Sequence, residues 1–78
     1  VLDVRSSKEF NSGHVKGAQN VPLNSIKHNI EKIKKLNKPV ITCCASGMRS
    51  ASAASILKQH GIEAINGGSW TNVNSLIG

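Results

Sequence analysis

The chain has 78 residues, of which 38% are hydrophobic, 18% charged and 3% aromatic, and its formal net charge is +6. This length suits one small domain with a thin hydrophobic core. No apolar run approaches the roughly 20 residues of a membrane-spanning helix, and the first residues lack the pattern of a secretory signal, so we expect a cytoplasmic protein without a membrane partner. The chain has no Tyr, one Phe and one Trp, so it lacks the aromatic side chains that stack on bases, and we expect no nucleic-acid partner.

The first third of the chain predicts a strand, a short helix and a second extended segment. Residues 1–4 form an apolar, β-branched run that is typical of a buried strand in a parallel sheet. Ser6 and Glu9 have the spacing of a capping box, which predicts a helix that ends at Gly13. Residues 18–22 predict a brief extended segment that ends at Pro22, because proline has no N–H for a sheet interior.

A longer helix is predicted next, with its N-cap at Asn24 or Ser25 and its end before Pro39. Its evidence is an apolar stripe at helical spacing: Ile26, Ile30, Ile33 and Leu36. Five of the ten basic residues lie in the same stretch: Lys27, Lys32, Lys34, Lys35 and Lys38. We interpret these lysines as a solvated helix face, and the alternative is a docking surface for an anionic partner.

The remaining residues continue the alternation of strands and helices. The predicted segments are a strand over 40–44, a tight turn over 45–49, a helix over 50–60 that stops at Gly61, a strand over 62–65 and a turn over 66–68. Residues 69–78 contain Trp70 and spaced apolar residues, and the pattern assigns them to no element. Together the segments predict an α/β fold, a small and mostly parallel sheet flanked by helices. Ligands of such sheets bind beyond the carboxyl ends of the strands, where Cys43 and Cys44 lie.

The two cysteines are adjacent, which limits their chemistry. Successive side chains of a strand point to opposite faces, so Cys43 and Cys44 are poorly placed for a disulfide with each other. The chain has no second cysteine pair and no ligand spacing typical of zinc. We therefore expect a reducing compartment, no metal and no cofactor, with the chemistry residing in a thiol.

Cys44 has the stronger signal of the two thiols because it lies between a strand and the start of a helix. The free N–H groups of that helix start, the small residues of the loop and the charge of Arg49 all favour a thiolate. Gly47 suits a loop position with positive φ. These features predict a lowered pKa and a nucleophilic Cys44, while the alternative is a small buried side chain at a strand end. Cys43 is expected to face the opposite side and to fill the core.

Five segments, in order, give the chain a family resemblance: Leu2–Arg5, Glu9–Phe10, Gly13–Pro22, Cys44–Ala51 and Asn66–Gly68. Their combination is similar to that of the single-domain rhodanese-like proteins, the thiosulfate sulfurtransferase family. The resemblance implies the rhodanese-like fold for a single domain over residues 1–78. Family members usually have a further strand and helix ahead of the first of these segments, so we expect this domain to lack them and to have an exposed sheet edge.

The resemblance also implies a mechanism and a set of site residues. Cys44 would take the outer sulfur of a donor as a persulfide and pass it to a thiol or cyanide, as a sulfurtransferase enzyme. The persulfide would be held by the backbone N–H groups of the loop residues Ala45, Ser46, Gly47, Met48 and Arg49. Arg49 would also order the loop and attract anions, with Arg5 and Ser50 in supporting roles. We expect Arg5 to pair with Glu9, and His14, at a matching family position, to fix its loop by a hydrogen bond.

The loop departs from family members that use thiosulfate well, because those carry extra cations where this chain has Ala45 and Met48. Arg49 is the one charge of this loop. Small anionic sulfur donors remain expected substrates, but an apolar Met48 favours a less charged donor, or a protein that donates or accepts the sulfur.

Two other functions stay open at this stage. The spacing from Cys43 to Arg49 is that of cysteine phosphatases, although no His precedes the cysteine and the glycine falls one place late. The other alternative is a persulfide carrier or redox-sensing module, in which Cys44 holds sulfur without efficient turnover.

Overall fold

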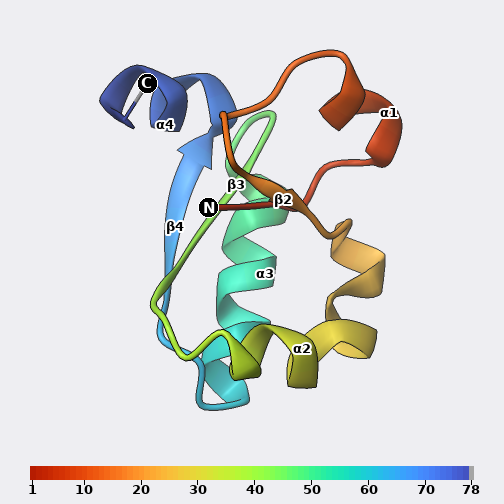
Figure 1. The fold of residues 1–78 in the computed structure, drawn as a ribbon, viewed down its shortest axis with the longest axis vertical. Coiled ribbons are helices and arrows are strands. Elements are labelled where there is room, and N and C mark those ends of the chain that lie inside the picture. The colour runs from red at the N-terminus through yellow and green to blue at the C-terminus, as the bar shows by residue number, and fades with distance from the viewer. Residues whose placement is uncertain (78) are drawn as a thin grey trace.

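A computed structural model describes residues 1–77 of the chain. Its elements, in chain order, are β1 (Leu2–Asp3), α1 (Ser7–Asn11), β2 (Gln19–Asn20), the 3-10 helix η1 (Leu23–Asn29), α2 (Ile30–Lys35), β3 (Val40–Cys44), α3 (Met48–Gln59), β4 (Ala64–Ser69) and α4 (Trp70–Ile77). The strands form one parallel sheet in the order β2-β1-β3-β4 (Figure 1). This architecture confirms the predicted α/β class with a small parallel sheet flanked by helices.

The sheet separates two apolar clusters, and the pleat of β3 contributes to both. Val40 and Cys44 lie in the larger cluster, which packs the sheet against η1, α2 and α3. Cys43 lies in the smaller cluster with Val15 and Val73, beneath α4. Successive side chains of a strand point to opposite faces, so the two cysteines are separated as predicted.

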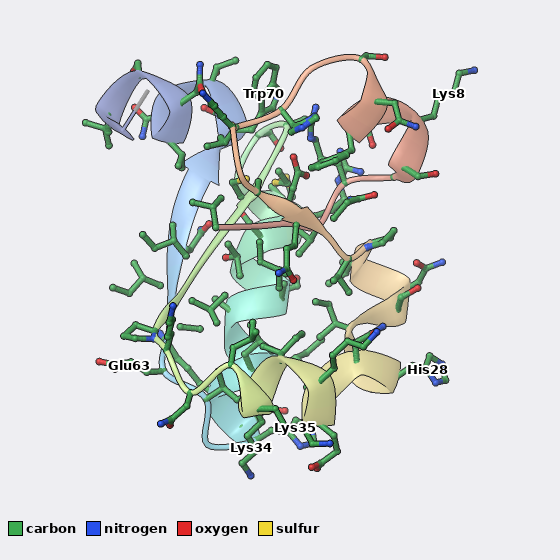
Figure 2. The ribbon with its side chains drawn as sticks, viewed as in Figure 1. Lys8, His28, Lys34, Lys35, Glu63 and Trp70 are labelled. Atoms are coloured by element: carbon green, nitrogen blue, oxygen red, sulfur yellow. The ribbon has the colours of Figure 1, made fainter. Side chains whose placement is uncertain are left out.

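The second quarter of the chain was predicted as one helix but is divided. A 3-10 helix, η1, precedes the six-residue helix α2. Ile26, Ile30 and Ile33 are buried, as the apolar stripe predicts, whereas Leu36 is 45% exposed beyond the end of α2. The five lysines of this stretch are all exposed, which agrees with a solvated face. Lys34 and Lys35 lie at the end of the molecule opposite Trp70 (Figure 2).

The last strand is longer than predicted and lies later in the chain. We expected a strand over 62–65 followed by a turn at the Asn-Gly-Gly segment, but β4 continues through that segment to Ser69. Thr42 pairs with Asn66 and Cys44 with Ser69, so β4 contains one residue more than β3 between the same two pairs. This bulge depends on Gly67, where a Cβ would come within 2.8 Å of the side chains of Ile41 and Val73.

Residues 70–77, which the sequence pattern left unassigned, form α4. The Ser69 hydroxyl accepts a hydrogen bond from the Asn72 N–H at 3.2 Å, as an N-cap does. Val73 is buried against the sheet. The face of α4 that carries it therefore covers the smaller apolar cluster. Among residues 1–77, no helix is long and apolar enough to cross a membrane.

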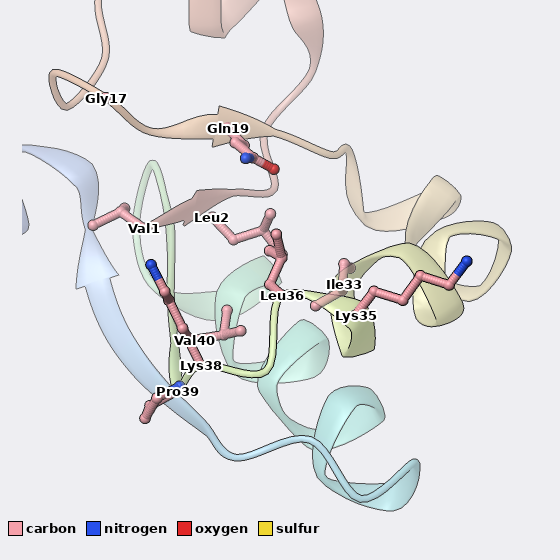
Figure 3. Close-up of a pocket in the computed structure, with 10 residues that line it drawn as sticks. All are labelled: Val1, Leu2, Gly17, Gln19, Ile33, Lys35, Leu36, Lys38, Pro39 and Val40. Carbon is pink, nitrogen blue, oxygen red and sulfur yellow. The ribbon is translucent and has the colours of Figure 1, made fainter.

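A cavity of about 440 Å³ opens at the amino ends of β1 and β3 (Figure 3). Val1, Leu2, Leu36 and Val40 supply much of its apolar lining. Cys44 lies at the carboxyl end of β3, so this cavity is at the other end of the strand from the thiol.

Candidate active site

Cys44 is the last residue of β3, and its side chain is fully buried on the α3 face of the sheet. Residues 45–47 then turn the chain, and α3 begins at Met48, two residues earlier than predicted. The thiol therefore lies below the first turn of α3, where backbone N–H groups lack partners within the helix. The predicted arrangement of strand, loop and helix start around Cys44 is present.

Two short hydrogen bonds define the surroundings of the Cys44 sulfur. The Gly47 N–H donates to Sγ at 2.9 Å, and the Ser50 Oγ lies 3.4 Å from Sγ. Hydrogen bonds from the backbone N–H groups of Ser46 and Ser50 also lower the pKa of the thiol. Ser46 and Gly47 belong to the loop amides predicted for this role, and Ser50 joins them from the first turn of α3.

These contacts change the ionisation of Cys44. Burial by itself raises the pKa of the thiol, because a low dielectric disfavours the thiolate. The hydrogen bond between the thiol and the Ser50 side chain, and those from the N–H groups of Ser50, Gly47 and Ser46, act in the opposite direction. Their combined effect prevails, and the pKa of Cys44 lies below its ordinary value. Cys44 is thus buried, as the alternative interpretation held, but it is buried among donors that favour the thiolate.

Cys43 has a different environment. Burial, and after it the negative charge of Asp3, raises the pKa of the Cys43 thiol to about 11. Its side chain lies in the cluster beneath α4, on the face of the sheet opposite Cys44. A neutral thiol on that face argues against Cys43 as the nucleophile of a phosphatase, and it agrees with the predicted core role.

The loop approaches β4 so closely that Gly47 is required at its turn. Gly47 has φ +99°, a conformation that other residues rarely adopt. A Cβ at this position would also lie 3.3 Å from the Cα of Gly68. In this conformation the N–H of Gly47 donates to Sγ at 2.9 Å, so the bulged strand and the loop together place the donor.

Asn66 of β4 fastens this arrangement, and sequence reasoning gave it no role. Its Oδ1 accepts hydrogen bonds from the Ser50 hydroxyl at 2.6 Å and from the Gly68 N–H at 3.0 Å. Its Nδ2 donates to the Gly47 carbonyl at 3.2 Å. Asn66 stood in the family-like Asn-Gly-Gly segment but was interpreted only as part of a turn. The contacts of Asn66 with Ser50 and Gly47 depend on the bulge in β4. The adjacent glycines Gly67 and Gly68 were the sequence signal that could have indicated this bulge.

Arg49 and Glu9 form an ion pair that the sequence analysis did not predict. The two Nη atoms of Arg49 donate to the two carboxylate oxygens of Glu9 at 2.8 and 3.0 Å. Glu9 Oε1 also accepts from the N–H and the hydroxyl of Ser6, each at 3.1 Å, in the predicted capping box. Hydrogen bonds from Arg49 and Ser6 lower the pKa of Glu9 to about 2.

The predicted pairing of Arg5 with Glu9 is wrong. Arg5 instead binds Asp3, with Nη2 2.7 Å from Oδ2, and also donates to the Gly13 carbonyl at 2.6 Å. Its guanidinium lies 4.8 Å from the centre of the Trp70 ring. Asp3 is fully buried and needs a cation beside it, whereas Glu9 faces solvent near Arg49.

His14 behaves as expected, since its Nδ1 lies 2.8 Å from the Phe10 carbonyl and its ring stacks on the Phe10 ring. In the described part of the chain, no three His, Cys, Asp or Glu side chains gather in a way that could hold a metal ion. The chemistry available at this end of the sheet is therefore that of a buried, activated thiol with amide donors around it and one arginine that acts on it electrostatically.

Comparison with known proteins agrees with this geometry. The family model "Rhodanese-like domain" matches residues 1–76. The uncharacterized protein YqhL of Bacillus subtilis is 39% identical over 61 residues, which are 78% of this chain and 48% of YqhL. The chain therefore spans about half the length of that relative. The thiosulfate sulfurtransferase GlpE of Shewanella oneidensis is 29% identical, over 96% of this chain and 78% of GlpE.

Among solved structures, a rhodanese with anions from Escherichia coli superposes with a TM-score of 0.81 at 32% identity, over 91% of this chain and 86% of that one. The order of the strands, the cysteine loop at the carboxyl end of β3 and the match over nearly all residues lead to one assignment. The chain belongs to the rhodanese-like domain family.

Proposed function

We propose that this protein is a sulfurtransferase that carries sulfane sulfur as a persulfide on Cys44. The observation that supports this most directly is the 2.9 Å hydrogen bond from the Gly47 N–H to the buried Cys44 sulfur. A thiolate is the nucleophilic form of cysteine, and this site lowers the pKa of the thiol. A relative of which the match covers 78% is named a thiosulfate sulfurtransferase, which supports the same reaction class.

In the first step, the Cys44 thiolate attacks the outer sulfur of the donor. A bond forms between Sγ and that sulfur, and the sulfur–sulfur bond of the donor breaks. The bonding electrons leave with sulfite if the donor is thiosulfate, or with a thiolate if it is an organic persulfide. The negative charge that remains on the outer sulfur of the enzyme lies next to loop amides, which favour anions.

In the second step, a thiolate or cyanide attacks the outer sulfur and becomes a persulfide or thiocyanate. Sγ leaves as a thiolate, which the N–H groups of Gly47, Ser46 and Ser50 stabilise again. Neither step changes the total number of electrons, and neither needs a cofactor. Both thiols of the chain are free in the structure, and we place the protein in a reducing compartment such as the cytoplasm.

The proposal is tested by incubating the protein with thiosulfate and measuring its intact mass, followed by peptide mapping. We expect the mass of one added sulfur atom, located on Cys44. The sulfur should be absent from Cys44→Ser and present in Cys43→Ser, which is the matched control because its thiol lies on the other face. If sulfur appears on neither cysteine with thiosulfate or with an organic persulfide, the proposal is wrong.

Turnover distinguishes an enzyme from a carrier. We expect repeated formation of thiocyanate when thiosulfate and cyanide are both in excess over protein. One equivalent of sulfur that loads on Cys44 and leaves slowly would instead identify a carrier module that needs its partner protein.

A further inference from the structure

Resting on the proposed function, we propose that Glu9 determines donor specificity: by neutralising Arg49, it makes the site select a sulfane donor of low charge, such as an organic persulfide, over dianionic thiosulfate. Three observations carry this inference: the geometry of the ion pair, the distribution of charge and the groove beside Arg49.

The first observation is that both terminal nitrogens of the Arg49 guanidinium already donate hydrogen bonds. Each Nη donates to a different oxygen of Glu9, at 2.8 and 3.0 Å. This bidentate geometry is the one by which arginine otherwise binds an anionic ligand. Arg49 is also the one charged residue of the cysteine loop. An anion that approaches the loop therefore competes with a carboxylate already in place.

Glu9 is held in position by its own helix. The N–H and the hydroxyl of Ser6 donate to Oε1, so the carboxylate belongs to the capping box of α1. Two donors from the chain thus restrict the side chain on the Ser6 side, while Arg49 binds it from the loop. Glu9 is therefore held next to Arg49 by the fold itself, where its carboxylate competes with any anionic ligand for the guanidinium.

The second observation is how the net charge is distributed. The two arginines are matched by Asp3 and Glu9, two of the four acidic residues, so the positive excess of the chain belongs to its lysines. Five lysines lie in the segment 27–38, of which Lys34 and Lys35 lie at the end of the molecule opposite Trp70, and Lys8 on α1 points outward into solvent (Figure 2). Arg49, which acts electrostatically on Cys44, therefore has a carboxylate partner of its own although the protein is strongly basic.

The third observation is a groove of about 410 Å³ beside Arg49. Its other lining residues carry no charge: Val4, Ser6, Pro22, Leu23 and Asn24. Met48, the residue before Arg49, is 78% exposed. Cys44 does not line this groove, which would hold the carbon body of an organic persulfide beside the paired Arg49 and offers a small dianion no other cation among its lining residues.

The electrostatic part of the inference is tested without any sulfur transfer. Cys44 is alkylated with iodoacetate, which is anionic, and with iodoacetamide, which is neutral but reacts by the same chemistry. We expect Glu9→Gln to raise the ratio of the two rate constants, iodoacetate over iodoacetamide, by roughly threefold to tenfold. Glutamine also serves in a capping box, so α1 keeps its N-terminal cap.

Glu31→Gln is the matched control, because it removes one negative charge from the exposed surface of α2. Its alkylation ratio should equal that of the unmodified protein. An unchanged ratio in Glu9→Gln, or an equal rise in both variants, would overturn the inference.

Donor preference is then measured by steady-state kinetics with thiosulfate and with the persulfide of 2-mercaptoethanol. We expect the unmodified protein to have the higher kcat/KM for the persulfide. In Glu9→Gln the KM for thiosulfate should fall roughly threefold to tenfold relative to the unmodified protein. The kcat for thiosulfate, and both kcat and KM for the persulfide, should stay within about twofold of the values of the unmodified protein. If thiosulfate is already the better donor, the specificity inference is wrong while the proposed function stands. If neither donor loads Cys44, both are wrong.

Discussion

Two adjacent thiols of identical covalent structure have opposite properties in this protein. Cys44 has a lowered pKa because donors surround its buried sulfur, and Cys43 has a pKa of about 11 because it is buried without them and near Asp3. The pleat of one strand separates the two environments. At the scale of single residues, reactivity is therefore decided by the few hydrogen bonds that each sulfur receives.

Ser50 is the residue whose removal tests this explanation. Its hydroxyl lies 3.4 Å from the Cys44 sulfur and 2.6 Å from Asn66 Oδ1. We expect Ser50→Ala to raise the pKa of Cys44, so that the alkylation profile moves to higher pH and the rate at neutral pH falls several-fold. The measurement is the rate of iodoacetamide alkylation of Cys44 between pH 5 and pH 10, a range that spans the ordinary thiol value of about 8.5.

Ser55→Ala is the control for this change, because Ser55 lies on the exposed face of the same helix α3. Its profile should coincide with that of the unmodified protein. A Ser50→Ala profile that stays in place would show that the backbone amides alone set the pKa.

At the scale of elements, the cysteine loop and β4 form one unit. The glycine pair lets β4 bulge, the bulge brings Gly68 against Gly47, and Asn66 ties the loop carbonyl to the strand. The sequence predicted a turn at this segment because adjacent glycines are typical of turns. That prediction was wrong, since β4 continues through the glycines. Here they serve the close approach of two backbones within a sheet.

We expect Gly47→Ala to damage this unit in two ways. Its φ of +99° and its contact with Gly68 should lower the free energy of unfolding by about 1–3 kcal/mol. The displaced N–H should also slow alkylation of Cys44 at neutral pH. Both effects are measurable, the first by urea unfolding and the second by the alkylation rate.

Gly17→Ala provides the comparison, because Gly17 also has positive φ, of +83°, but nothing lies within 4 Å of its would-be Cβ. This variant should lose some stability and keep the alkylation rate of Cys44. Equal loss of alkylation in both variants would mean that general destabilisation, and not the loop contact, accounts for the effect.

At the scale of the whole molecule, one buried ion pair connects distant segments. Arg5 follows β1, binds the buried Asp3, donates to the carbonyl of Gly13 and lies against Trp70 at the start of α4. The pair is nearly inaccessible to solvent, with side chains 5% and 0% exposed. Its removal on one side leaves a charge buried without a partner, which is costly in a domain of this size.

We expect Arg5→Met to lower the free energy of unfolding by about 3–5 kcal/mol, because Asp3 is left as an unpaired buried charge. The double variant Asp3→Asn, Arg5→Met should recover part of that loss, since no buried charge remains. Chemical denaturation of the four proteins of this cycle measures the coupling. If the double variant is less stable than the sum of the two single changes predicts, the explanation by an unpaired charge fails.

The sequence by itself determined those features that depend on consecutive residues. Short apolar runs that alternate with segments of helical spacing predicted the α/β class. The predicted capping box of Ser6 and Glu9 is present, and Cys44 lies between a strand and the start of a helix, as predicted. Hydrophobic periodicity and cap chemistry act over a few residues, so they can be recognised without the fold.

The tertiary structure alone decided which side chains meet. Arg49 binds Glu9 across 40 positions of the chain, whereas the nearer Arg5 is taken by Asp3. Asn66 reaches the loop only because β4 continues through its glycines. The choice among possible ion-pair partners is settled by burial and by the paths of distant segments, because a buried carboxylate takes the cation that the fold brings to it. That is why Met48 alone could suggest a less charged donor from the sequence, whereas the pairing of Arg49 with Glu9 could be derived only from the folded molecule.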